Sequence, residues 1–204
     1  MTSVTTNTTF AEAKTGVFLD VEECPIPEDL DPKSLYQNIR TALANKGYHG
    51  EVSIKAFGDR NQIPGYFESA GIEIHPVGDK RLRIREMLIS FFHWLYTNKP
   101  ELCNVMIISR NGMEFASALH SCKELGHNIL VANPLHGPKI CQCGCKTKSY
   151  DLITEMWLWE TLADGGDPLV KTKREEEVSN EEEEDDVSED LSSFTRTFSS
   201  FVCC

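Results

Sequence analysis

Long apolar runs are missing from this sequence, and their absence argues against a protein with membrane-spanning helices. No uninterrupted apolar stretch approaches the roughly 18 residues that a membrane-spanning helix needs. The first ten residues, MTSVTTNTTF, also lack the apolar core of a secretory signal. We therefore expect an intracellular protein without a transmembrane segment, cytoplasmic by default, whose eight cysteines are reduced thiols.

A basic excess is missing as well. The chain has 20 lysines and arginines against 32 aspartates and glutamates, which gives a formal net charge of -12. Residues 175–190 alone hold 11 of the acidic residues and no basic one, whereas residues 1–174 hold 21 acidic and 19 basic residues, a net charge of -2. The nearly neutral body lacks a strongly basic footprint, which neither proves nor excludes RNA binding. The acidic segment is expected to increase solubility, with contacts to protein partners or shielding of a nucleic-acid site as alternatives.

Strand-like and helix-like segments alternate through the middle of the chain. Strands are predicted at 17–21, 51–58, 72–75, 104–109 and 128–132, and helices at 31–47, 61–71, 79–98 and 113–126. Parallel strands separated by helices indicate an α/β fold in which helices cover both faces of a mostly parallel central sheet. We expect a disordered N-terminus over 1–13, one domain over 14–166, and a disordered acidic tail rich in Ser and Phe over 167–204.

The segment YDLITEMWLWETLADGG, residues 150–166, is predicted to form one further helix that ends at two glycines. Trp157 and Trp159 lie in this apolar stretch. They could stack on bases, but large aromatic side chains in such a stretch more often complete a core. We therefore favour a structural role for both tryptophans.

Acidic and polar side chains follow several of the predicted strands. Ligands of open parallel sheets bind beyond the C-terminal ends of the strands, so these positions are candidates for a site. The candidates are Asp20, Glu22, Glu23, Asp59, Ser109, Asn111 and Glu114, together with Glu86, which belongs to the helix predicted at 79–98 and is expected to lean toward the same edge. Carboxylates that converge repel one another unless a cation such as Mg²⁺ or Mn²⁺ binds between them, and two such ions can drive phosphodiester cleavage. The alternative is that these side chains are solvated loop carboxylates or charges at helix N-termini.

A family resemblance accompanies these residues. The segments that carry it are AKTGVFLDVEECPIP, LYQNIRTAL, VSIKAFGDRNQIP, REML, IISRNGMEFASALH, NILVANP and WLWETLADGG. Together, from about residue 14 to 166, they resemble the plant NYN-domain proteins of the PIN-like nuclease superfamily and are similar to the ribonuclease-like domain of meiosis regulator and mRNA stability factor 1. The resemblance implies a PIN-like three-layer α/β/α sandwich, Mg²⁺- or Mn²⁺-dependent RNA cleavage in active members, a role in RNA metabolism and the regulation of gene expression, and for some members an association with peroxisomes.

Carried over by position, the resemblance implies Asp20, Glu86, Asn111 and Glu114 as catalytic residues. It implies Asp20, Glu22, Glu86 and Glu114 as metal ligands. Asp59 and Ser109, which follow two of the predicted strands, are secondary candidates. The sequence departs from the family pattern at several of these positions. Glu23 stands where the family has Asn, Glu86 replaces an aspartate, and SRNGMEF has one residue more than the family segment. A methylene group added to a ligand misplaces its oxygen by about an ångström, which catalytic geometry tolerates poorly.

Two hypotheses therefore remain open. The first is a metal-dependent endoribonuclease whose ions are held by the carboxylates named above. The second is a non-catalytic RNA- or protein-binding module on the same fold, which the charge-neutral Asn111 and the neighbouring Arg110 support.

Cysteines at two places invite further interpretation. The segment CQCGC contains Cys141, Cys143 and Cys145, but thiolates one residue apart do not easily share one tetrahedral zinc ion, so a reduced loop is favoured. The terminal Cys203 and Cys204 resemble a double-cysteine lipidation signal. Such ends normally belong to GTPases, and this chain lacks a Walker-type phosphate loop, so lipidation is the less favoured alternative.

Overall fold

A computed structural model describes the chain over residues 8–61, 63, 65–110, 112–135 and 152–170. These residues belong to one compact unit, Met1–Val170. The remaining segment, Lys171–Cys204, contains most of the predicted acidic tail and lies outside the described residues. That segment also contains the terminal Cys203 and Cys204. Two further predicted features lie outside the described residues, namely Asn111 and the Cys141/Cys143/Cys145 loop.

Six parallel strands form the central sheet in the described part of the chain. They are β1 (Thr15–Asp20), β2 (Val52–Gly58), β3 (Ile72–Pro76), β4 (Asn104–Ile108), β5 (Asn128–Asn133) and β6 (Glu155–Leu158). Their spatial order is β3-β2-β1-β4-β5-β6, and every neighbouring pair is parallel. The predicted α/β fold with a parallel central sheet is confirmed.

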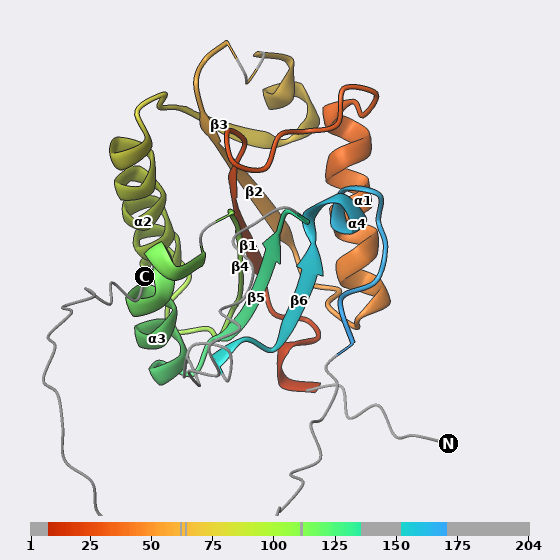
Figure 1. The fold of residues 1–204 in the computed structure, drawn as a ribbon. Coiled ribbons are helices and arrows are strands. Elements are labelled where there is room, and N and C mark those ends of the chain that lie inside the picture. Colours follow the sequence, from red (N-terminus) through yellow and green to blue (C-terminus); the bar gives the residue numbers. More distant parts are fainter. Residues whose placement is uncertain (1–7, 62, 64, 111, 136–151, 171–204) are drawn as a thin grey trace, which may run out of the picture. The chain divides into compact units, whose positions relative to one another are not determined.

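Helices cover both faces of this sheet, as Figure 1 shows, with α1 and α4 on one face and α2 and α3 on the other. The α-helices are α1 (Pro32–Asn45), α2 (Lys80–Thr97), α3 (Ala116–Glu124) and α4 (Trp159–Ala163), and short 3-10 helices span Thr8–Phe10, Gly65–Ala70 and Gly112–Phe115. The predicted three-layer α/β/α arrangement is therefore confirmed. No helix within the described ranges has both the length and the apolar character needed to cross a membrane.

Aspartates begin the two longest helices at the residues that the sequence indicated. Asp31 accepts hydrogen bonds from the backbone N–H groups of Lys33 and Ser34 at 2.9 and 3.1 Å, and a proline follows it. Asp79 accepts one from Leu82 N–H at 2.9 Å. These bonds satisfy N–H groups that a helix leaves without an internal partner in its first turn. They fix the start of α2 directly after the loop that follows β3.

The central strand β1 is buried along its whole length and contributes to two separate cores. Val17 and Leu19 pack into the core between the sheet and α1 and α4, whereas Phe18 packs into the core beneath α2 and α3. Because side chains alternate between the two faces of a strand, one short apolar run supplies both cores. Asp20 then ends β1 at the C-terminal edge of the sheet.

The prediction of one helix over 150–166 is wrong in its described part. Residues Glu155–Leu158 form β6, which pairs with β5, and only Trp159–Ala163 are helical. Met156 packs towards one core and Trp157 lies in the other, which is the two-residue period of a strand. Trp157 and Trp159 are both buried, so the favoured structural role is confirmed.

The N-terminal segment is held to the domain before the predicted boundary at residue 14. Asn104, at the start of β4, donates from Nδ2 to the carbonyl oxygens of Phe10 at 3.0 Å and Ala13 at 3.1 Å. Phe10 also packs against the core on the α1 side. The predicted disorder of 1–13 is therefore corrected for residues 8–13, because a buried amide holds their backbone.

Candidate functional site

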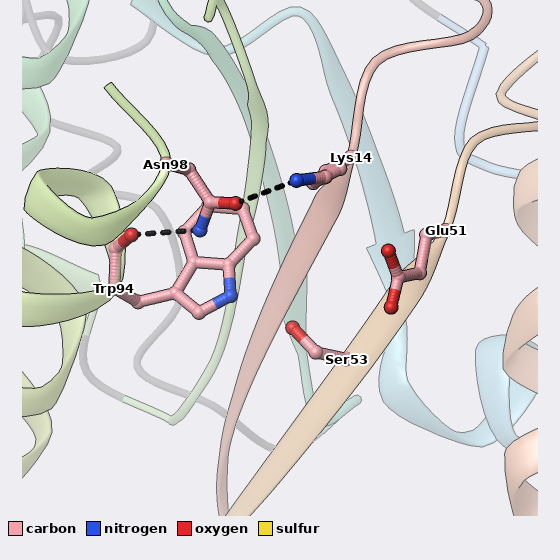
Figure 2. A pocket seen from close by; sticks show the side chains of 5 residues that line it. All are labelled: Lys14, Glu51, Ser53, Trp94 and Asn98. Carbon is pink, nitrogen blue, oxygen red and sulfur yellow. Dashed lines mark hydrogen bonds between the residues drawn. The ribbon is translucent and has the colours of Figure 1, made fainter. Parts of the chain in front are cut away.

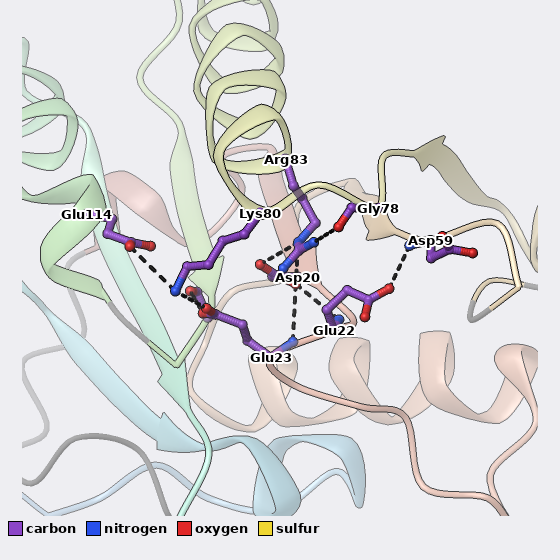
Figure 3. Close-up of polar contacts among 9 residues, drawn as sticks. Asp20, Glu22, Glu23, Asp59, Gly78, Lys80, Arg83 and Glu114 are labelled. Atoms are coloured by element: carbon purple, nitrogen blue, oxygen red, sulfur yellow. Dashed lines mark hydrogen bonds and ion pairs between the residues drawn. The ribbon is translucent and has the colours of Figure 1, made fainter.

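The loops after β1, β2 and β4 meet the N-terminus of α2 at the C-terminal edge of the sheet, as Figure 3 shows. In the sheet, β2 and β3 lie on one side of β1, and β4, β5 and β6 lie on its other side. This reversal of strand order is where open parallel sheets commonly bind ligands. The side chains that gather here are Asp20, Glu22, Glu23, Asp59, Lys80, Arg83, Ser109 and Glu114.

A buried ion pair lies at the centre of this edge. Arg83 Nε lies 2.9 Å from the Asp20 carboxylate, and the two side chains are only 4% and 1% exposed. Arg83 Nη1 also donates to the carbonyl oxygen of Gly78 at 2.9 Å. A guanidinium group held by both a carboxylate and a carbonyl has a fixed direction. Arg83 thus ties the end of β1 to the loop that leads into α2.

The same carboxylate also holds the turn after β1. Asp20 Oδ1 accepts hydrogen bonds from the backbone N–H groups of Glu22 at 3.0 Å and Glu23 at 3.2 Å. Burial raises the pKa of Asp20, and the Arg83 guanidinium and the Glu23 N–H act in the opposite direction. The carboxylate therefore needs these donors to stay charged in the interior.

Glu23 connects β1 to β4 and α2. Its Oε2 accepts a hydrogen bond from the Ser109 hydroxyl at 2.9 Å, and its Oε1 lies 2.8 Å from Lys80 Nζ. The same ammonium lies 3.6 Å from Glu114 Oε1. Lys80 therefore stands between two carboxylates and is itself about half exposed.

The pH dependence of the unfolding free energy is predicted to report on the Glu23 carboxyl group. Burial alone would raise the pKa of Glu23, but the hydrogen bonds from Lys80 and Ser109 hold that pKa below its ordinary value. A carboxyl whose folded-state pKa is lowered contributes stability above its unfolded pKa of about 4.3, and this contribution is lost as the pH falls through the folded value. The unfolding free energy of wild type should therefore exceed that of Lys80→Met at pH 6, and the difference should shrink towards pH 3. A difference that is the same at both pH values contradicts this assignment.

Glu22 and Asp59 lie side by side at the neighbouring loop. Glu22 Oε1 accepts the backbone N–H of Asp59 at 2.6 Å. The turn after β1 can approach the end of β2 this closely because the last residue of β2, Gly58, has no side chain. A Cβ added there would clash with a methyl carbon of Val21. Asp59 Oδ1 accepts the N–H of Asn61 at 2.8 Å. Both carboxylates are thus used to hold the loop after β2.

Glu86 has a different partner from the one that the sequence suggested. It lies one turn beyond Arg83 on α2, and its Oε1 accepts a hydrogen bond from Arg85 Nη2 at 3.1 Å. The residue that α2 presents to Asp20 is Arg83. The predicted roles of Glu86 as a catalytic residue and metal ligand stay predictions.

A divalent cation does not fit the arrangement of these side chains. Mg²⁺ and Mn²⁺ need several oxygen ligands whose lone pairs point at one position. Asp20, Glu22 and Glu23 in this site each have a hydrogen-bond donor or a cation at 3.2 Å or less, and so does Glu86 further along α2. Over the residues that the structure describes, no group of three or more His, Cys, Asp or Glu side chains could hold a metal ion.

Lys80 and Arg83 are the residues that sequence reasoning missed. Both lie in the first turn of α2, three residues apart, so they project from one side of the helix. The segment DKRLRIREML does indicate that acidic partners are nearby. Basic side chains at the start of a helix are repelled by the positive end of the helix dipole and need acidic side chains beside them. That signal does not say which acidic residues those are.

A pocket lies at the opposite edge of the sheet, where the strands begin (Figure 2). Its lining consists of Lys14, Glu51, Ser53, Trp94 and Asn98. Lys14 Nζ donates to Asn98 Oδ1 at 3.2 Å, and the buried Ser53 hydroxyl has no hydrogen-bond partner within the described part of the chain. None of the predicted site residues belongs to this pocket.

Two of three comparisons with known proteins returned a match. The family model described as "NYN domain" matches residues 14–146, which include strands β1 to β5 and end before β6. A search of curated proteins returned no match. Among solved structures, the crystal structure of a protein of unknown function from Vibrio parahaemolyticus is similar, with 12% sequence identity and a TM-score of 0.48 over 76% of this chain and 94% of that chain.

Proposed function

We propose that this chain, which belongs to the NYN domain family and has the fold of the PIN-like nucleases, is a non-catalytic RNA-binding module. The observation that carries the proposal is the buried pair between Arg83 and Asp20. Asp20 is the acid that the family resemblance retains best, and here a guanidinium group occupies its carboxylate. An aspartate used in this way is not available as a metal ligand.

Exposed arginines near the same edge support an interaction with RNA phosphates. They are Arg60 after β2, Arg81 and Arg85 on α2, and Arg110 after β4. Arginine side chains near a crevice contribute charge-assisted hydrogen bonds to phosphate oxygens without reading the base sequence. Binding of this kind needs no metal ion and depends strongly on salt.

Fluorescence anisotropy with labelled single-stranded and structured RNA tests the proposal. We expect saturable binding in EDTA, unchanged by Mn²⁺, and intact RNA on a denaturing gel. The double variant Arg60→Ala/Arg110→Ala should bind several-fold more weakly, and the slope of log affinity against log salt should fall by about 1 for each lost phosphate contact. Lys123→Ala is the matched control, because Lys123 is exposed at the C-terminal end of α3, away from this edge.

Two outcomes would count against the proposal. Absence of saturable RNA binding would remove the RNA-binding function. Mn²⁺-dependent cleavage that disappears in Asp20→Asn would instead support the endoribonuclease hypothesis, with Asp20, Glu86, Asn111 and Glu114 as catalytic residues. The family supports that second candidate, whereas the donors and cations already bound to the carboxylates at this edge count against it.

We also propose the finer resemblance to plant NYN-domain proteins and to the ribonuclease-like domain of meiosis regulator and mRNA stability factor 1. It carries with it a role in the regulation of gene expression. We further propose a cytoplasmic location as the default, with the peroxisome, which only the resemblance suggests, as the alternative. Imaging of a fluorescently tagged chain against cytosolic and peroxisomal markers tests the location. Sequencing of RNA crosslinked to the chain in cells tests the role.

A further inference from the structure

We propose that Lys80 and Arg83 take the place of divalent metal ions among the carboxylates at this edge, so that the chain neutralises its own acidic cluster. The inference goes beyond RNA binding, because it concerns only how Asp20, Glu23 and Glu114 are neutralised. It predicts that the folded domain has no use for a metal ion there, and that removing Lys80 opens a cation site.

The two cations are held in different ways. Arg83 is buried, and its guanidinium group is fixed by the Asp20 carboxylate and by Gly78 O. Lys80 is half exposed and bridges Glu23 at 2.8 Å and Glu114 at 3.6 Å, with the Ser109 hydroxyl on the far oxygen of Glu23 (Figure 3). Arg83 is therefore part of the fold, whereas the ammonium group of Lys80 can be removed without opening the core.

Charge at the start of α2 gives independent support. The N-terminus of a helix carries a partial positive charge, so acidic side chains are favoured in its first turn and basic ones are disfavoured. This helix has no acidic residue in its first turn, yet it places Lys80 and Arg83 there. The three carboxylates opposite offset that cost. Hydrogen bonding to Glu23 in turn raises the pKa of Lys80, which keeps its ammonium group charged.

A bound divalent cation is excluded by the same contacts. It would have to lie close to an ammonium and a guanidinium group, which repel it, and to replace donors on carboxylate oxygens that are already engaged. Removal of Lys80 relieves the nearer repulsion and leaves Glu23 and Glu114 without their shared cation. Carboxylates in that situation attract Mn²⁺.

Isothermal titration with MnCl2 and thermal melts in EDTA or Mn²⁺ test the inference on the full-length chain. Wild type should show no saturable Mn²⁺ binding and the same melting temperature in both solutions. Lys80→Met should melt lower than wild type in EDTA and recover in Mn²⁺. It should also bind Mn²⁺ saturably, at least about tenfold more tightly than the weakest affinity that the titration detects. Lys123→Met, at an exposed lysine on α3 away from this edge, is the matched control and should melt and bind Mn²⁺ as wild type does.

A second variant locates any gained site. Lys80→Met/Glu114→Gln should lose the gained Mn²⁺ binding, because one of the two freed carboxylates is gone. Saturable Mn²⁺ binding by wild type overturns the inference, and so does a Lys80→Met variant that binds no more Mn²⁺ than wild type. None of these readouts involves RNA. Saturable Mn²⁺ binding by wild type would count against the inference and against the non-catalytic part of the proposed function, whereas a failure of RNA binding would leave the inference standing.

Discussion

Replacing Arg83 with methionine is expected to lower the free energy of unfolding by about 3–5 kcal/mol, the usual cost of removing one partner from a buried ion pair. Methionine has nearly the length of the arginine stem and fills the space above β1, so the loss is chiefly electrostatic. Asp20, 1% exposed, would keep its two backbone hydrogen bonds but lose its counter-charge. Chemical denaturation of both proteins at pH 7 measures the difference.

Two control variants separate the buried charge from the removal of an arginine as such. Arg85→Met removes an arginine that is 63% exposed and pairs with its neighbour Glu86, so its effect should stay within about 0.5 kcal/mol. Asp20→Asn/Arg83→Met removes both charges and keeps an oxygen for the turn after β1. This double variant should recover much of the lost stability, because no unpaired charge remains in the interior.

The result that contradicts this account is a single Arg83→Met variant as stable as Arg85→Met. Such stability would mean that Asp20 takes up a proton or finds water when the guanidinium group is absent. It would also weaken the argument that Asp20 is unavailable to a metal ion in the wild-type chain.

Local signals explain how much of the fold could be predicted from the sequence. The helices predicted at 31–47 and 79–98 begin at Asp31 and Asp79, which the structure shows to be the capping residues of α1 and α2. Short apolar runs between turn residues placed β1 to β5 to within a few residues. Each of these signals lies within one turn or one strand, where chemical preference acts directly on the backbone.

The candidate site was predicted only in part, because its decisive contacts join distant segments. Asp20 was correctly placed at the C-terminal edge of the sheet. Its partner Arg83 lies 63 positions further along the chain, and the partner of Ser109 lies 86 positions away at Glu23. The sequence places these residues on elements but does not show which side chain of a helix faces a given strand end. The metal-site hypothesis therefore counted carboxylates and omitted the cations that meet them.

The missed strand β6 has a different cause. Its sequence, EMWL, is short and almost uniformly apolar, and four such residues fit one turn of a helix as well as a strand. The free edge of β5 decides the outcome, because pairing there satisfies backbone groups that the sequence does not reveal. Trp157 then lies on the α1 face of the sheet and donates from Nε1 to Gly166 O at 3.1 Å.

Replacing Trp157 with alanine is expected to lower the free energy of unfolding by about 3–5 kcal/mol, because it empties a large and fully buried position in the core. Trp157→Phe keeps a ring in the core but loses the bond to Gly166, so it should cost less than the alanine variant. Tyr96→Ala is the control, since it removes an aromatic side chain that is 71% exposed on α2 and should change stability by less than about 1 kcal/mol. An alanine variant at Trp157 as stable as the one at Tyr96 would mean that the ring is not part of the core and that β6 does not complete the sheet.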